Sequence, residues 1–133
     1  MYGIIATWRM ALEGISKADS MLKNNESAAD SIEEAIKAVE DFEYYKSVGY
    51  GGLPNEEMEV ELDAAFMDGD TLEFGCVGGV KDFANPVSIA RSLMHYDANN
   101  FLIGQGAEKY ASRHGFETVS YTHLRAHETC ADL

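Results

Sequence analysis

The run Val60-Glu61-Leu62-Asp63-Ala64-Ala65-Phe66-Met67-Asp68-Gly69 decides the fold class. Apolar residues at every second position of this run predict a strand with one buried face. The pair Asp68-Gly69 is typical of a β-hairpin turn, and the apolar alternation resumes over residues 72–80. The sequence therefore predicts a half-buried antiparallel hairpin in the middle of the chain.

Amphipathic helices are predicted on both sides of this hairpin. Residues 9–23 repeat apolar side chains at helical spacing, and the next helix begins at Ser27, a natural N-cap with Asp30 three residues later. Asn85-Pro86 reads as an N-cap followed by proline at the first helical position, and a last helix ends at Gly115. In the second helix, acidic residues lie off the apolar stripe and are expected to face water: Glu33, Glu34, Glu40, Asp41 and Glu43.

Two further short segments are predicted to be strands. Gly3 to Thr7 is rich in β-branched side chains and reads as a buried strand, and residues 101–103 read as another. The expected order is β-α-α-loop-β-β-α-β-α. Helices with one apolar face and a half-buried hairpin indicate mixed α and β layers, an α+β fold.

Composition restricts the class of partner. The chain has 133 residues, with 10 Lys+Arg against 23 Asp+Glu and a formal net charge of −13. A surface this acidic repels phosphate backbones and anionic lipids, so neither nucleic acid nor membrane is an expected partner. With two cysteines and no leader-like start, we expect no disulfide framework and a cytoplasmic location.

From Thr118 onward, apolar residues follow neither the helical spacing nor the alternation of a strand. We therefore expect residues 118–133 to be an unstructured tail, and the stretch resembles translated adapter sequence, an artefact of gene assembly. His123 and His127 stand at the i, i+4 spacing of a metal site, but Leu124 takes the place of the glutamate that the zinc-protease pattern requires. No third ligand is evident, and no metal site is predicted.

Other groups that could carry chemistry have simpler interpretations. The glycine run 49–52 lacks the Lys-Ser/Thr of a phosphate-binding loop, and indicates instead positive φ or close backbone approach. Glu59, Glu61 and Asp63 share one strand face, most simply a solvated one, with Asp63 alternatively bonding within the fold. Cys76 reads as a small buried hydrophobe. No catalytic set can be assembled from spacing, and no cofactor is predicted.

Taken together, several segments resemble the glycosylasparaginase family of N-terminal nucleophile hydrolases, which split the bond between N-acetylglucosamine and asparagine. Thr7-Trp8 at the end of the first predicted strand separates this branch from plant-type asparaginases and isoaspartyl peptidases, which begin with a His-Gly-Gly-Ala-Gly-like string. The resemblance covers about residues 2–117, and its most specific part is the glycine loop. The matching segments are 6–8, 47–54, 61–64, 67–69, 85–91 and 102–107.

The resemblance implies an αββα sandwich, of which residues 1–117 would be an incomplete, α-subunit-like part. In this family a precursor cuts itself before a threonine, whose hydroxyl becomes the nucleophile and whose α-amine acts as base. Trp8 matches the family's tryptophan at the substrate pocket, and Ser47 matches the serine of the glycine loop. Both are predicted to bind substrate, as an indole wall and a hydrogen-bonding hydroxyl.

The family's Asp-Thr-Val-Gly cleavage string is absent. Glu117-Thr118-Val119-Ser120 imitates it only faintly, so no catalytic residue is assigned to this chain. We expect the N-terminal part of an amidohydrolase for glycosyl-asparagine or a related asparagine amide, inactive without its β-subunit half and part of a heterodimer-based oligomer when complete. The alternative is a non-enzymatic acidic domain that associates with a partner through an exposed sheet.

Overall fold

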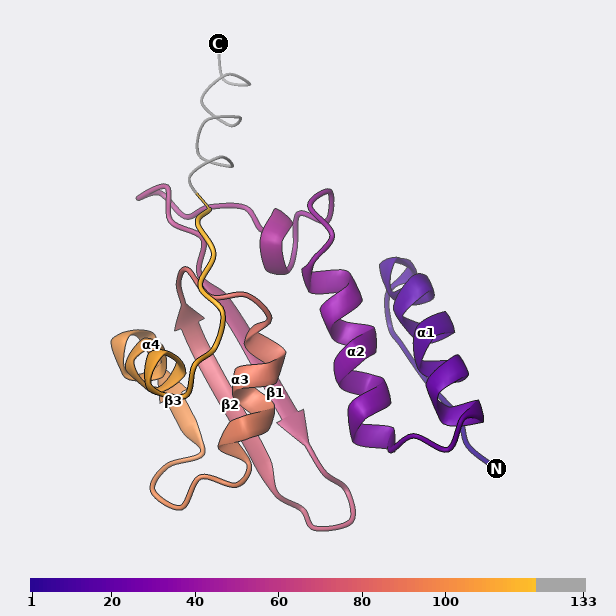
Figure 1. The fold of residues 1–133 in the computed structure, drawn as a ribbon. Helices are drawn as coiled ribbons and strands as arrows, with labels where there is room; N and C mark the ends of the chain where they lie inside the picture. The colour runs from indigo at the N-terminus through magenta and orange to yellow at the C-terminus, as the bar shows by residue number, and fades with distance from the viewer. Residues whose placement is uncertain (122–133) are drawn as a thin grey trace.

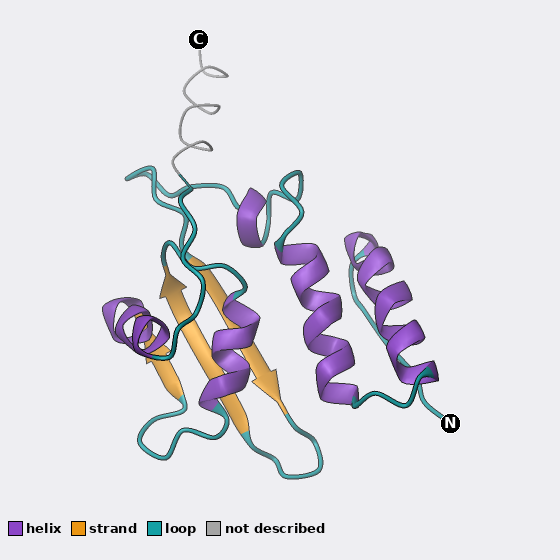
Figure 2. Cartoon of the chain, viewed as in Figure 1, coloured by secondary structure: helices purple, strands orange, loops and turns teal. Residues whose placement is uncertain are grey.

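The computed structural model describes residues 1–121. Within this range, four helices and three strands follow one another in the mixed order that the sequence predicts, apart from its first strand (Figures 1 and 2). The helices are α1 (Leu12–Lys23), α2 (Ala28–Glu40), α3 (Pro86–Leu93) and α4 (Gly104–Arg113); the strands are β1 (Leu62–Met67), β2 (Phe74–Val80) and β3 (Phe101–Ile103); single 3₁₀ turns are η1 (Arg9–Ala11) and η2 (Gly49–Gly51).

The sheet has the order β1-β2-β3. β1 and β2 form the predicted antiparallel hairpin, although the connection from Asp68 to Glu73 is longer than a tight turn and is closed by a bond from the Asp68 amide to the Glu73 carbonyl at 2.9 Å. β3 runs parallel to β2, which requires a crossover connection, and α3 supplies it.

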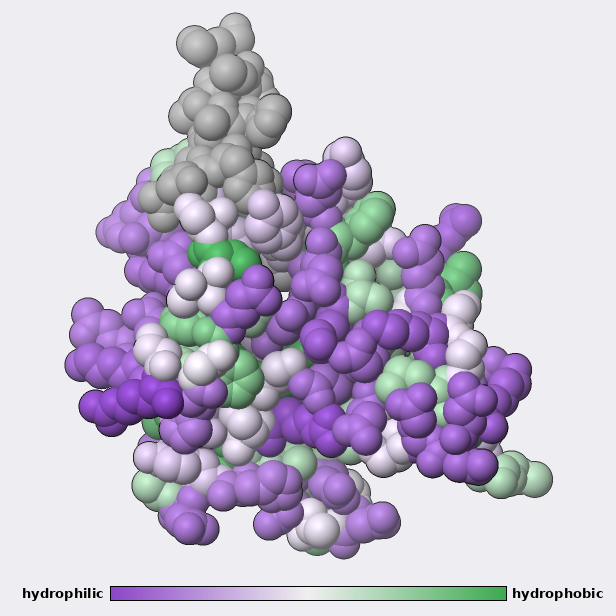
Figure 3. Space-filling model, in the orientation of Figure 1, coloured by the Kyte–Doolittle hydropathy of each residue, from purple (hydrophilic) through white to green (hydrophobic). Residues whose placement is uncertain are grey.

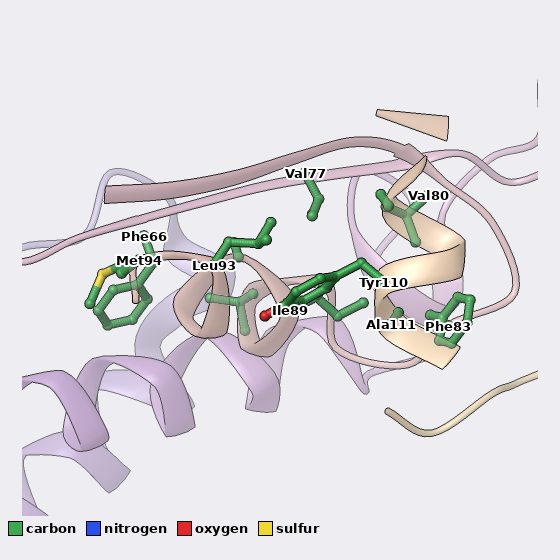
Figure 4. Close-up of a cluster of buried hydrophobic side chains, with 12 residues drawn as sticks. Phe66, Val77, Val80, Phe83, Ile89, Leu93, Met94, Tyr110 and Ala111 are labelled. Carbon is green, nitrogen blue, oxygen red and sulfur yellow. The ribbon is translucent and has the colours of Figure 1, made fainter. Parts of the chain in front are cut away.

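One face of the sheet carries the core. α3 and α4 lie over this face, and their buried side chains meet those of β1 and β2 (Figures 1 and 4). The alternation in β1 is confirmed, because Leu62 and Phe66 are buried whereas Met67 is exposed. On the face seen in Figure 3, hydrophilic side chains cover α4, whereas pale and hydrophobic ones lie among them near α3.

The opposite face of the sheet is apolar and uncovered. Met67 pairs with Phe74, and both side chains are exposed. The same face continues across β3, where Phe101 and Ile103 are 55% and 66% exposed. Single exposed apolar residues are ordinary, but neighbouring ones on adjacent strands form the kind of patch that marks an interaction surface.

The prediction of a strand over residues 3–7 is wrong. The segment has no strand pairing and is mostly exposed, with Ile5 at 95%. It runs beside α1, with α2 between it and the sheet (Figure 1). Its apolar residues instead line a cavity of about 360 Å³ with α1 and α2.

Polar bonds attach α2 to α3. Arg91 on α3 pairs with Glu33 and, at 2.6 Å, with Asp30, while its guanidinium lies 5.6 Å from the centre of the Phe66 ring. The N-cap predicted at Ser27 is confirmed, since its Oγ accepts the Asp30 amide at 3.0 Å. Asp30 therefore contributes both to the start of α2 and to its attachment.

Replacing Arg91 by alanine is expected to destabilise the chain by about 1–3 kcal/mol, because Glu33 is left largely buried without its cation. Lys23→Ala is the matched control: its pair with Asp19 is solvent-exposed, so removing it should change the free energy of unfolding much less than removing Arg91 does. Urea unfolding of both variants checks this. Equal losses of unfolding free energy in the two variants would mean that the ion pair between Arg91 and Glu33 contributes no more than an exposed one.

Packing continues past the expected boundary at residue 117. Thr118 forms an isolated antiparallel β-bridge with Phe83, and the Val119 amide donates to the Asp82 carbonyl at 3.0 Å. Tyr121 is 2% exposed and donates its hydroxyl to the Phe83 carbonyl at 3.0 Å. Residues 118–121 thus differ from the unstructured tail that was expected, because a single bridged segment needs no long periodic pattern. His123 and His127 lie outside the described residues.

Candidate functional site

A cavity of about 340 Å³ opens where the glycine loop meets the end of α2. Its walls come from the end of α2, the loop, β1 and the start of α3. The residues that line it are Ile36, Val39, Glu40, Ser47, Val48, Gly49, Glu61, Leu62, Asp63, Ala64, Ala65, Pro86 and Val87. The cavity therefore draws together segments that are far apart in the sequence.

The glycine loop has the geometry that its sequence predicts. Gly49 has a φ of +55°, and a Cβ placed there would lie 2.1 Å from the Glu40 carbonyl oxygen. A Cβ on Gly51 would lie 2.4 Å from the carbonyl oxygens of Glu43 and Tyr45. Glycine is required at these two positions because the loop is pressed against backbone that cannot move aside.

Ser47 lines this cavity and is exposed, which places it on the solvent-facing side. The loop around it is closed by two backbone bonds, from Leu53 to Lys46 at 3.2 Å and from Gly52 to Gly49 at 3.0 Å. Its position is thus fixed by the loop and not by burial of its own side chain.

Trp8 lies immediately before η1 and is 56% exposed. Its carbonyl accepts the Ala11 amide at 3.1 Å, so its backbone starts the first helical turn. Because α1 and α2 are antiparallel, the start of α1 and the end of α2 lie at the same end of the helical pair (Figure 1). The structure brings the two predicted substrate-binding segments to one end, but Trp8 does not line the Ser47 cavity.

Glu40 differs from its expected place on the surface of α2. It was expected to face water, yet it is 6% exposed. Its carboxylate accepts the Val87 amide at 3.2 Å and the Asn85 side-chain amide at 3.3 Å. Burial, opposed by these bonds and reinforced by Asp41 and Glu33, raises the pKa of Glu40 to about 7. The available signal was its spacing of four residues from Ile36, on the apolar stripe.

The carboxylates at and just before the start of β1 bond to other groups of the fold. Asp63 Oδ1 accepts the Gly79 amide at 2.8 Å, across the irregular start of the β1–β2 pairing, which confirms that it bonds within the fold. Glu59 and Glu61 pair with Lys81, the latter at 3.6 Å, and are partly exposed. These contacts explain all three carboxylates as structural, solvated groups.

Cys76 is not the buried residue that was expected. It is a free, half-exposed cysteine that alternates with buried Val77 on β2, and it therefore faces the uncovered side of the sheet. Within residues 1–121 no group of three His, Cys, Asp or Glu side chains is arranged to hold a metal. Over the same range no helix combines the length and the apolar character needed to cross a bilayer.

Comparison with known proteins identifies the family. The model of the Asparaginase_2 family, described as asparaginase, matches residues 5–133. An N(4)-(beta-N-acetylglucosaminyl)-L-asparaginase from Elizabethkingia miricola is 34% identical over 86% of this chain and 33% of its own length. The isoaspartyl peptidase/L-asparaginase of Rattus norvegicus is 40% identical over 77% of this chain and 32% of its own.

A plant-type L-asparaginase from Pyrococcus horikoshii is 43% identical over 68% of this chain and 29% of its own length. The relatives therefore carry names of more than one asparaginase type, and the chain spans about a third of their length. The family match runs through the glycine loop, the hairpin and the Asn85-Pro86 helix start. The chain belongs to the asparaginase family Asparaginase_2, among the N-terminal nucleophile hydrolases that its sequence resembles.

Proposed function

We propose that this chain is the N-terminal part of an amidohydrolase that cleaves an asparagine-type side-chain amide. The family match supports the reaction class, and the share of the relatives that the chain spans supports a larger protein. The uncovered apolar face of the sheet is the observation that carries the proposal. A second sheet packed on that face would complete an αββα sandwich.

In this proposal the missing part supplies the chemistry. Residues 1–117 correspond to the α subunit, and a following β-subunit half provides the nucleophilic threonine after self-cleavage. This chain alone is then inactive, the complete enzyme is built on such heterodimers, and no metal or other cofactor is used. We place the protein in the cytoplasm. We regard residues 118–133 as a sequence artefact foreign to it, of which residues 118 and 119 contact Asp82 and Phe83.

Trp8 and Ser47 are proposed to form part of the substrate pocket. Both are exposed at the end of the helical pair that faces the glycine loop, which leaves them available to a ligand. An indole offers an apolar wall to a sugar or an aliphatic chain, and a hydroxyl can bond an amide or carboxylate. Thr7-Trp8 favours glycosylated asparagine over free asparagine or isoaspartyl peptides.

The test is a chimera in which this chain replaces the N-terminal third of the Elizabethkingia miricola relative. Trp8→Ala is expected to lower kcat/KM for glycosyl-asparagine by about 10-fold or more, and Ser47→Ala by a similar factor, because each removes a substrate contact worth about 1.4 kcal/mol or more. Tyr44→Ala is the control, as an exposed aromatic side chain outside the proposed pocket.

Steady-state kinetics with glycosyl-asparagine, L-asparagine and a β-aspartyl dipeptide gives both the size of these effects and the substrate preference. Losses no greater than that of Tyr44→Ala would remove Trp8 and Ser47 from the pocket. A preference for the dipeptide would overturn the choice of glycosylated asparagine.

A second candidate function rests on the same uncovered face: an acidic, non-enzymatic domain that associates through its sheet. Neighbouring exposed apolar groups on β1, β2 and β3 favour association of some kind. Light scattering on the purified chain separates the two. If the purified chain is a stable oligomer and the chimera shows no turnover, the binding domain is favoured. If the purified chain is a monomer and the chimera is active, the enzyme is favoured.

A further inference from the structure

Glu40 is a buried charged residue that the proposed reaction does not use. It is the last residue of α2, and it lines both the Ser47 cavity and a neighbouring cavity of about 340 Å³ that also contains Asn85 and Tyr121. The residue therefore forms part of the wall of both cavities. Burying a carboxylate in such a position is unfavourable unless it makes specific bonds.

Those bonds are to the start of α3. Asn85 is the N-cap residue of this helix, but its backbone is left-handed, with a φ of 47°, and its side chain makes no cap bond. Glu40 takes over part of that role by accepting the Val87 amide, and it also accepts the Asn85 side chain, which donates to Asp41 at 2.7 Å. The carboxylate thus joins the end of α2 to the start of α3.

The backbone of the same residue supports the glycine loop. A Cβ on Gly49 would lie 2.1 Å from the Glu40 carbonyl oxygen and 2.3 Å from its Cα, so the loop that carries Ser47 rests directly on Glu40. Pro86 and Val87 also line the Ser47 cavity, and the carboxylate accepts the Val87 amide there. One residue therefore contacts both walls.

We propose that Glu40 is a positioning residue of the candidate site: by tying the start of α3 to the end of α2, its carboxylate fixes the spacing between Ser47 and the opposite wall of the cavity. The proposal rests on the proposed function in assigning that cavity to substrate. Glu40 is assigned no contact with substrate and no part in the chemical step.

The charges around Glu40 make this tie sensitive to pH near neutrality. Asp41 and Glu33 share its helix, and Arg91 faces Glu33 from α3. The other titratable groups that line its two cavities are Glu61, Asp63, Tyr50, Glu117 and Tyr121. Because the pKa of Glu40 is raised to about 7, the group gains a proton as the pH falls through 7 and loses acceptor capacity toward Val87 or Asn85.

Amide NMR of the 133-residue chain between pH 5.5 and 8.5 tests the proposal. We expect the amide of Val87, which bonds the carboxylate directly, and those of Gly49 and Ser47 to titrate together with a midpoint near 7. In Glu40→Gln this shared titration should vanish, while Glu43→Gln, an exposed loop carboxylate, should keep it. Titration of Val87 without Ser47 and Gly49 would overturn the positioning role, as would a titration that survives in Glu40→Gln.

Asn85→Gly provides a second variant that does not depend on the folding of Glu40→Gln, because glycine accepts the left-handed backbone at this position. It removes a donor that lowers the pKa of Glu40, so the shared midpoint should move upward. An unchanged midpoint would contradict the proposed link that the Glu40 carboxylate makes between the end of α2 and the start of α3. No substrate enters this experiment, so its outcome is independent of whether the chimera is active.

Discussion

Replacing Gly49 by alanine is expected to destabilise the chain by about 2–4 kcal/mol. Two independent effects add: the left-handed backbone costs an L-residue about 1–2 kcal/mol, and the new methyl group would overlap the Glu40 carbonyl, a backbone atom that cannot rotate away. The loop would have to lift from the end of α2 and would carry Ser47 with it.

Gly69→Ala is the matched control for this prediction. Gly69 lies in the β1–β2 connection, its φ is not positive, and a Cβ there meets nothing within 4 Å. Its effect should stay within about 0.5 kcal/mol. Urea unfolding at a fixed pH compares the two variants, and similar losses would mean that the glycine loop is not seated on α2 as described.

Stability should fall as the pH rises through neutrality, because of Glu40. Its pKa in the folded chain is about 7, above the ordinary 4.5, so between these values the folded state binds more protons than the unfolded state. The stability that depends on the proton is fully present below about pH 4.5 and is lost above about pH 7. A pKa difference of this size corresponds to roughly 3 kcal/mol.

Glu40→Gln removes this titration while retaining an oxygen that can accept the Val87 amide. We expect the free energy of unfolding of this variant to be flatter between pH 5 and 8 than that of the unmodified chain, and higher above pH 7. Glu43→Gln should leave the slope as it is. Denaturant unfolding across this pH range decides the matter, and identical slopes for all three proteins would show that Glu40 is not the group responsible.

Local patterns predicted the elements that bury one face against a near neighbour. The alternation from Val60 to Phe66 gave β1, Ser27 gave the start of α2, and Asn85-Pro86 gave the start of α3. In each case the signal and the partner lie within a few residues or in an adjacent element. Such patterns are set by the period of the backbone and by the donors left free at helix ends.

Predictions that needed a distant partner fared less well. Residues 3–7 have the composition of a strand, but a strand forms only beside another strand, and in this structure α2 lies between them and the sheet. Burial of Glu40 depends on α3, which begins far along the chain and provides the bonds that make burial tolerable. Trp8 and Ser47 carry no local signal that distinguishes them, so their assignment came from resemblance alone.

Turnover by the chimera tests most directly the proposal that this chain is one part of a two-part amidohydrolase. The purified 133-residue chain should release no product from glycosyl-asparagine above a buffer blank. The chimera with the Elizabethkingia miricola relative should hydrolyse the same substrate, and should lose this activity when its cleavage-site threonine is replaced by alanine. Turnover by the chain alone, or a folded and self-cleaved chimera without activity, would contradict the account.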